Sequence, residues 1–276
     1  MVHRIYLCFH LIRNLVDYPL RQLFHWRRNG LRLKNESKET LFNDLKEPDC
    51  SQAQAAAQRL LETYHLDSLY SNSTQDNYRE NLYYLDMLES SLNTGMPHLP
   101  LKITAADIGP SHWFYVKALY AALKWWQFPQ GREVTLFGFE RDAYRVYSDL
   151  YSRYDHALAH SNHLLDVTYI PHGFEPQPNS FDIITQLFPF IFLSDHLEWG
   201  LPLSLFDSAA LLASVWVSLK PGGLLIIANQ GKQEHEEQTE LLRRVNIPGK
   251  ASYLFNSLFY RYDQPRYITI ACKENE

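Results

Sequence analysis

Two carboxylates in the second half of the chain each stand close to the end of an apolar run. Asp107 lies near the end of the run 101–108, which Gly109 follows, and Glu140 directly follows the run 133–139. A carboxylate can accept two hydrogen-bond donors at once, and a glycine lets a ligand approach the backbone because it has no Cβ. This pattern predicts a ligand-binding turn. The alternatives are that Asp107 is a cap or turn residue and that Glu140 caps the next helix.

Three amide side chains also follow apolar runs. Gln186 lies near the end of the run 181–187, and Asn229 and Gln230 lie at the end of the run 224–229. Ligands of open α/β sheets bind outside the carboxyl ends of the strands, so these amides are candidate substrate contacts. The alternative is that Asn229 and Gln230, with the glycine after them, simply form a turn.

The elements that must position these residues alternate between strand and helix patterns. We expect strands at 101–108, 133–139, 166–170, 181–187 and 224–229, and helices at 113–126, 142–158 and 233–245. Such alternation implies right-handed crossovers and a parallel sheet. The last two strands, 251–260 and 266–273, are separated by five residues, which is too short for a helix. The sequence therefore predicts an α/β, Rossmann-like, mostly parallel seven-stranded sheet with a terminal antiparallel β-hairpin.

The first hundred residues show helical and polar segments in place of alternating strands and helices. Residues 29–50 are polar and mixed in charge, whereas 51–66 and 78–92 have helical spacing and propensity. We expect two parts, a helical N-terminal extension or lid with a polar linker at 1–99 and an α/β domain at 100–276.

Four segments at the ends or starts of expected strands follow one another along the chain: ADIGPS (106–111), GFERD (138–142), NSFDIIT (179–185) and LKPGGLLIIAN (219–229). Together with the closing hairpin, they resemble the class I S-adenosylmethionine-dependent methyltransferases, whose seventh strand inserts antiparallel beside the fifth. The resemblance implies S-adenosyl-L-methionine as cofactor and methyl transfer to an unidentified small-molecule or protein acceptor. It also implies a set of cofactor-binding residues, namely Asp107, Gly109, Ser111, Glu140, Phe174 and Glu175.

In that implied set, Asp107 would orient the ammonium group, Glu140 the ribose hydroxyls, and Phe174 and Glu175 would flank the adenine. Ser111 would cap the helix 113–126 and supply a contact for the carboxylate.

The chain departs from the family in its first turn, where Pro110 and Trp113 replace glycines of the usual GxGxG pattern. Either the indole of Trp113 turns into the core and leaves the cleft open, which we favour, or it fills the space of the methionine tail. A catalytically inactive methyltransferase-like binding or scaffold module is therefore the alternative function. A nicotinamide-dependent oxidoreductase is a weaker one, because GxGxxG is absent and the closing hairpin differs from that fold.

Composition narrows the function further. The 276 residues are 46% hydrophobic with a net charge of −5, which argues against a general nucleic-acid binder. The three cysteines, which lack CxxC spacing, suggest a reducing, cytoplasmic setting, and we expect no metal site. There is no run of about 18 apolar residues to span a membrane.

The charge is concentrated at the N-terminus. Residues 1–34 carry seven Lys or Arg side chains and one acid, for a local charge of +6, interleaved with apolar residues. We favour a helix packed on the domain with its arginines in water. The alternative is a basic amphipathic helix lying on an anionic membrane. Pro19 should break or kink this helix near Asp17 and Tyr18.

Overall fold

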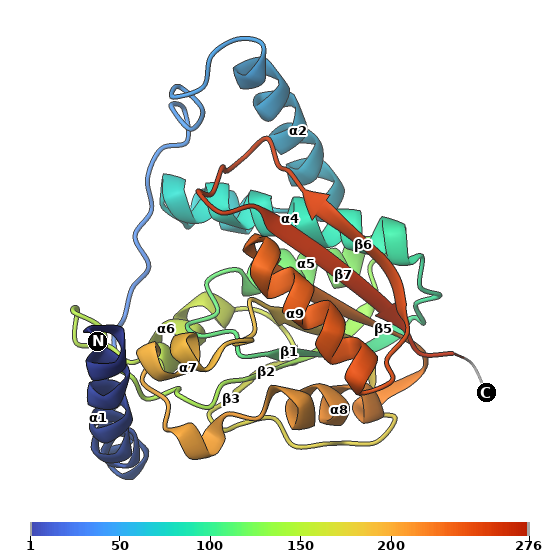
Figure 1. The fold of residues 1–276 in the computed structure, drawn as a ribbon. Coiled ribbons are helices and arrows are strands. Elements are labelled where there is room, and N and C mark those ends of the chain that lie inside the picture. The colour runs from blue at the N-terminus through green and yellow to red at the C-terminus, as the bar shows by residue number, and fades with distance from the viewer. Residues whose placement is uncertain (1, 275–276) are drawn as a thin grey trace.

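The computed structural model describes residues 2–274. A seven-stranded sheet forms the centre of the molecule (Figure 1). The strands are β1 (Lys102–Ile108), β2 (Glu133–Phe139), β3 (Val167–Ile170), β4 (Phe181–Leu187), β5 (Leu219–Gln230), β6 (Gly249–Phe255) and β7 (Arg266–Cys272). The helices are α1 (Val2–Phe24), α2 (Asp49–Tyr64), α3 (Asp67–Ser71), α4 (Gln75–Gly95), α5 (Val116–Trp125), α6 (Arg153–Ser161), α7 (Leu193–Glu198), α8 (Ser208–Ser218) and α9 (Gly231–Arg244), with a short 3₁₀ turn at Leu203–Leu205.

The strand order is β3-β2-β1-β4-β5-β7-β6. The first five strands pair in parallel, whereas β7 is antiparallel to both β5 and β6. Every residue of β4 is buried, as expected of a strand in the middle of a parallel sheet that is covered on both faces. The predicted α/β sheet with its antiparallel closing hairpin is confirmed.

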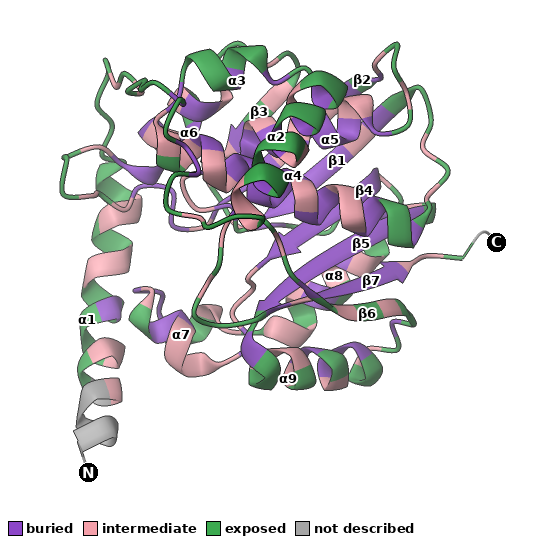
Figure 2. Ribbon diagram, turned by 90° about the horizontal axis from the view of Figure 1, so that it is seen from above, coloured by how far each residue is buried: buried purple, intermediate pink, exposed green. Residues whose placement is uncertain are grey.

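Helices cover both faces of the sheet (Figure 2). One face packs on α4 and α5, which α2 contacts from outside, and side chains from residues 41–92 share its core with those of the strands. The other face packs on α8 and α9 around Ile184, Ile227 and Leu241. The proposed division of the chain at residue 99 thus separates two stretches of sequence that contribute to one hydrophobic core.

The predicted helix at 142–158 and the N-terminal helix differ from the observed ones. The expected helix at 142–158 starts only at Arg153, because Ser152 and Asp155 form a capping box there and residues 142–151 fold into turns closed by a bridge between Val146 and Ser152. The expected break at Pro19 is absent, since α1 continues to Phe24. Pro19 and Leu15 are exposed, so water can satisfy the Leu15 carbonyl that lacks its helical donor.

Candidate functional site

The turn after β1 is not helical, contrary to the sequence prediction. Ser111 and Trp113 both have positive φ angles, of 56° and 53°, and α5 begins only at Val116. Ser111 therefore does not cap a helix, and Tyr115 occupies the N-cap position without a side-chain cap. Gly109 has a φ of 74°, and a Cβ added there would have nothing within 4 Å, so the backbone is accessible at this point.

The indole of Trp113 lies in the core, as we favoured, but it also engages Asp107. Its Nε1 donates to Asp107 Oδ2 at 2.8 Å, and a Cβ on Gly138 of β2 would lie 2.8 Å from the ring. Thr185 Oγ1 donates to the other carboxylate oxygen of Asp107 at 2.7 Å. Trp113 and Asp107 are both fully buried, and burial raises the pKa of Asp107 to about 6. Asp107 thus links Trp113 of the turn to Thr185 of the adjacent strand β4.

Glu140 is likewise occupied by the protein. Its Oε2 accepts the backbone N–H of Ser111 at 2.9 Å, and its Oε1 accepts that of Asp142 at 2.8 Å. The residue is 5% exposed, and burial raises the pKa of its carboxyl group, an effect that the nearby Arg153 opposes. The carboxylate therefore ties the turn after β1 to the turn after β2.

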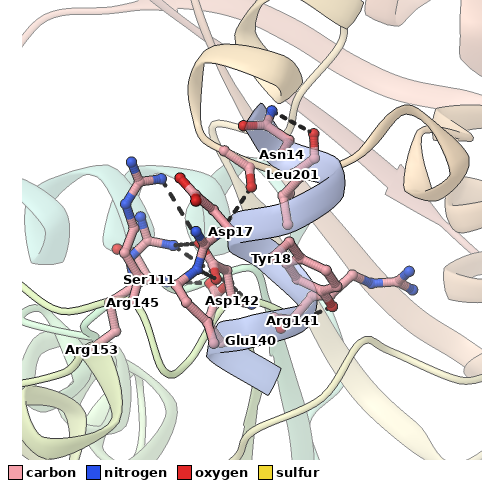
Figure 3. A network of polar contacts seen from close by, with 12 residues as sticks. Asn14, Asp17, Tyr18, Ser111, Glu140, Arg141, Asp142, Arg145, Arg153 and Leu201 are labelled. Carbon is pink, nitrogen blue, oxygen red and sulfur yellow. Dashed lines mark hydrogen bonds and ion pairs between the residues drawn. The ribbon is translucent and has the colours of Figure 1, made fainter. Parts of the chain in front are cut away.

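Helix α1 docks beside this carboxylate through polar side chains (Figure 3). Arg21 pairs with the fully buried Asp142 at 2.8 Å, and its Nη2 also donates to the Gly200 carbonyl at 2.8 Å. Arg153 lies 3.4 Å from the other Asp142 oxygen. Asn14, which is 2% exposed, donates to the carbonyls of Leu197 and Leu201. The N-terminal helix is thus fixed over the segments that follow β2 and β4.

The other predicted contacts are scattered. Phe174 is buried, with its ring edge-on to Phe139 at 5.1 Å between centroids, whereas Glu175 is exposed. Gln186 and Asn229 are buried near the carboxyl ends of the adjacent strands β4 and β5, whereas Gln230 is exposed.

Asn229 stands out because its amide oxygen and nitrogen are both buried without a hydrogen-bond partner. Since buried polar groups are nearly always paired, this amide is the best structural support for a ligand contact among the predicted residues.

Sequence reasoning missed a buried arginine at the same edge. Arg266 begins β7, is 8% exposed, and stacks its guanidinium on the rings of Phe188 and Tyr262. Its Nε and Nη1 are buried without an acceptor. The available signal was a charged residue at the first position of an otherwise apolar closing strand.

His112 of the turn after β1 forms a cluster with two histidines of α6. His112 Nδ1 is 3.1 Å from the Tyr147 hydroxyl, and its ring is 6.0 Å from that of His156 and 6.2 Å from that of His160. Burial lowers the pKa of His112 to about 4 and that of His160 to about 3. Among the described residues, no group of three His, Cys, Asp or Glu side chains can hold a metal ion.

These contacts bear on whether the site fits S-adenosylmethionine. The carboxylates of Asp107 and Glu140 each have both oxygens bonded within the protein, and neither side chain is open to solvent. A bound cofactor would have to donate its ammonium and ribose hydroxyl protons to these carboxylate oxygens, which are buried and already accept bonds from the protein. In the arrangement described, the residues do not fit the cofactor, and their assigned cofactor roles stay predictions.

Comparison with known proteins yields solved structures only. No family model matches the chain, and no curated protein matches it. A precorrin-6y C5,15-methyltransferase from Geobacter metallireducens GS-15 is 13% identical over 70% of this chain and 89% of that one, with a TM-score of 0.43. An S-adenosylmethionine-dependent methyltransferase from Aquifex aeolicus is 15% identical over 69% and 97%, with a TM-score of 0.43. A protein from Bordetella parapertussis described as possibly exported is 14% identical over 70% and 68%, with a TM-score of 0.46.

The strand order itself identifies the fold. Five parallel strands in the order 3-2-1-4-5, with a seventh strand inserted antiparallel between the fifth and the sixth, form the sheet expected from the resemblance to class I S-adenosylmethionine-dependent methyltransferases. The chain has the class I methyltransferase fold.

Proposed function

We propose that this protein is a binding module built on the methyltransferase fold, in which the carboxylates of the cofactor edge serve as structural ties. The observation that carries the proposal is the Glu140 carboxylate, which accepts the backbone N–H groups of both Ser111 and Asp142. Because Glu140 is only 5% exposed, the ribose hydroxyls could reach these oxygens only if one of the two turns moved and broke its bond. Each bond to a charged acceptor is worth about 1.5–3 kcal/mol, so displacement is costly.

The test is calorimetric titration of the purified protein with S-adenosylmethionine and S-adenosylhomocysteine. We expect no saturable heat at ligand concentrations up to about 1 mM, which corresponds to binding weaker than about −4 kcal/mol. Saturable binding with a micromolar dissociation constant would overturn the proposal.

Methyl transfer to a small-molecule or protein acceptor is the second candidate, and one observation favours it. Gly109 keeps its positive φ and the open space beside it, so the backbone approach that a cofactor needs is still present. In that case the turn must shift, with the Ser111 N–H leaving Glu140. The variant Trp113→Gly, which loosens this turn, should then bind S-adenosylmethionine more tightly than the wild type, whereas under the first proposal it only loses stability.

A further inference from the structure

Arg266 is placed where ligands of this fold class bind. It is the first residue of β7 and pairs in register with Gln230, the last residue of β5. Because β7 runs antiparallel to β5, Arg266 lies at the carboxyl edge of the parallel strands. Phe188, which immediately follows β4, stacks on it at 4.8 Å between the guanidinium carbon and the ring centroid. Substrates of open α/β sheets bind at this edge.

Within the part of the chain that the structure describes, no carboxylate lies at ion-pair distance from Arg266, although Glu234 is close enough for the guanidinium to oppose the rise that burial causes in its pKa. Its buried Nε and Nη1 also donate to no acceptor. An isolated buried charge and unpaired donors are both strongly unfavourable, and native proteins normally compensate them. The guanidinium therefore calls for an acceptor from outside the chain.

The surroundings of the guanidinium are aromatic. Tyr262 stacks on it at 4.2 Å, and the ring of Tyr83 on α4 packs edge-on against Tyr262 at 5.1 Å between centroids. The buried hydroxyl of Tyr83 has no partner at full hydrogen-bond geometry, but it faces Arg266, whose guanidinium opposes the rise that burial causes in the pKa of Tyr83. Two side chains from α4 and β7 thus present unpaired polar groups within one aromatic cluster.

We propose that Arg266 and Tyr83 form the binding site for a small molecule that carries a carboxylate on an apolar body. One guanidinium charge is balanced by one carboxylate charge, whereas a doubly charged phosphate would leave net negative charge in an apolar setting. The aromatic rings of Phe188 and Tyr262 contact the apolar part. This inference gives the proposed binding module a ligand class, and it does not depend on whether S-adenosylmethionine binds.

The test uses phenylacetate as the probe, with phenylacetamide as its neutral isostere and inorganic phosphate as the competing anion. Binding is followed by thermal shift and calorimetry on the full chain. The key variant is Arg266→Met, which keeps the length of the side chain and removes its charge. Arg261→Met is the matched control. Arg261 lies in the connection between β6 and β7, is exposed, and pairs with Asp49 on the surface.

We expect phenylacetate to raise the melting temperature of the wild type and of Arg261→Met, and the amide and phosphate to have no effect. Arg266→Met should weaken phenylacetate binding at least tenfold, and Tyr83→Phe should weaken it by a few fold. Without ligand, Arg266→Met should melt no lower than the wild type, because it removes an uncompensated buried charge.

Equal binding of the acid and the amide, tighter binding of phosphate, or unchanged affinity in Arg266→Met would each overturn the inference. The titration with S-adenosylmethionine is a separate experiment, so the two proposals fail independently.

Helix α1 presents an exposed apolar face to solvent. The apolar side chains of α1 face outward, and seven large ones are between 44% and 73% exposed, namely Phe9, Ile12, Leu15, Val16, Leu20, Leu23 and Phe24. The spacing of most of these residues, three or four apart, places them on one side of the helix. The opposite side carries Asn14, Tyr18 and Arg21, which dock on the domain. Figure 2 shows α1 along the border of the molecule with exposed segments down its length.

The charge around this apolar face indicates its partner. The first 34 residues carry a net charge of +6. On α1, Arg13 pairs with Asp17, whereas the exposed Arg27, Arg28, Arg32 and Lys34 follow the end of the helix. Two copies that met through this face would bring like charges together, whereas an anionic lipid surface complements them. Among the described residues, no helix is both long and apolar enough to cross a bilayer. We infer that α1 lies in the surface of an anionic membrane, with its apolar face toward the lipid.

Sedimentation with vesicles tests this inference. At low salt, the full chain should sediment with phosphatidylcholine vesicles that contain 30% phosphatidylserine and not with pure phosphatidylcholine, and added salt should weaken binding. Ile12→Glu combined with Leu23→Glu should abolish sedimentation, and Leu165→Glu, at a site 72% exposed outside α1, should not change it. The inference is wrong if the wild type stays in the supernatant, or if it is a dimer that the double variant converts to a monomer.

Discussion

Replacing Glu140 by alanine tests whether its carboxylate is a structural tie. The change removes two hydrogen bonds to a charged acceptor and leaves the N–H groups of Ser111 and Asp142 without it. At about 1.5–3 kcal/mol for each bond, the loss is roughly 3–6 kcal/mol. Removing a carboxylate whose pKa burial has raised returns part of that cost. We therefore expect the free energy of unfolding to fall by about 2–4 kcal/mol.

The assay is urea unfolding at pH 7.5, followed by circular dichroism. Glu140→Gln keeps the shape and one acceptor oxygen, so it should lose about half as much stability as Glu140→Ala. The matched control is Glu175→Ala, because Glu175 belongs to the same set of predicted cofactor residues but is exposed. That control should change stability by less than about 0.5 kcal/mol. If Glu140→Ala unfolds within 0.5 kcal/mol of the wild type, the carboxylate holds nothing in place and is free for a ligand.

Two further predictions concern the same turn. Between pH 6.5 and about 4, His112 binds a proton in the unfolded chain but not in the folded protein, so this residue lowers the free energy of unfolding as the pH falls. Urea unfolding at pH 4.5 and 7.5 should show a smaller loss of this free energy in His112→Gln than in the wild type, by up to roughly 3 kcal/mol. An equal loss would contradict the burial of a neutral imidazole. Gly138→Ala should lower stability by about 1–3 kcal/mol, because its Cβ would lie 2.8 Å from the buried indole of Trp113; a melting temperature equal to that of the wild type would show that the indole is not packed there.

The sheet was predictable because burial on both faces leaves apolar runs that turn signals delimit. The position of each carboxylate followed from this, since Asp107 and Glu140 lie at the ends of such runs. Their partners were not predictable, because the path of the turn depends on positive φ angles at Ser111 and Trp113. Residues other than glycine seldom adopt such angles, and the local propensity of serine or tryptophan does not indicate them.

Arg266 illustrates a second limit of sequence reasoning. Its place at the first position of β7 was correctly predicted, but its importance depends on neighbours far away in the chain. Tyr83 lies on α4 and Phe188 follows β4, and the topology of the sheet brings both to the start of β7. An unpaired donor is defined by everything that surrounds it, so only the folded structure reveals it.

Helix α1 shows how a buried charge elsewhere decides which face of a helix is exposed. From its own sequence, we expected the apolar side to pack inward and the arginines to lie in water. The fully buried Asp142 opposes this preference, because a carboxylate at 0% exposure needs positive partners, and Arg21, 2.8 Å away, joins Arg153 in supplying them. Docking Arg21 and Asn14 inward turns Ile12, Val16 and Leu23 outward, since they lie on the opposite side of the same helix. The outward orientation of the apolar face is therefore a consequence of the ion pair. Arg21→Met should undock the helix from the domain, and the orientation that we infer for membrane binding should be lost with it.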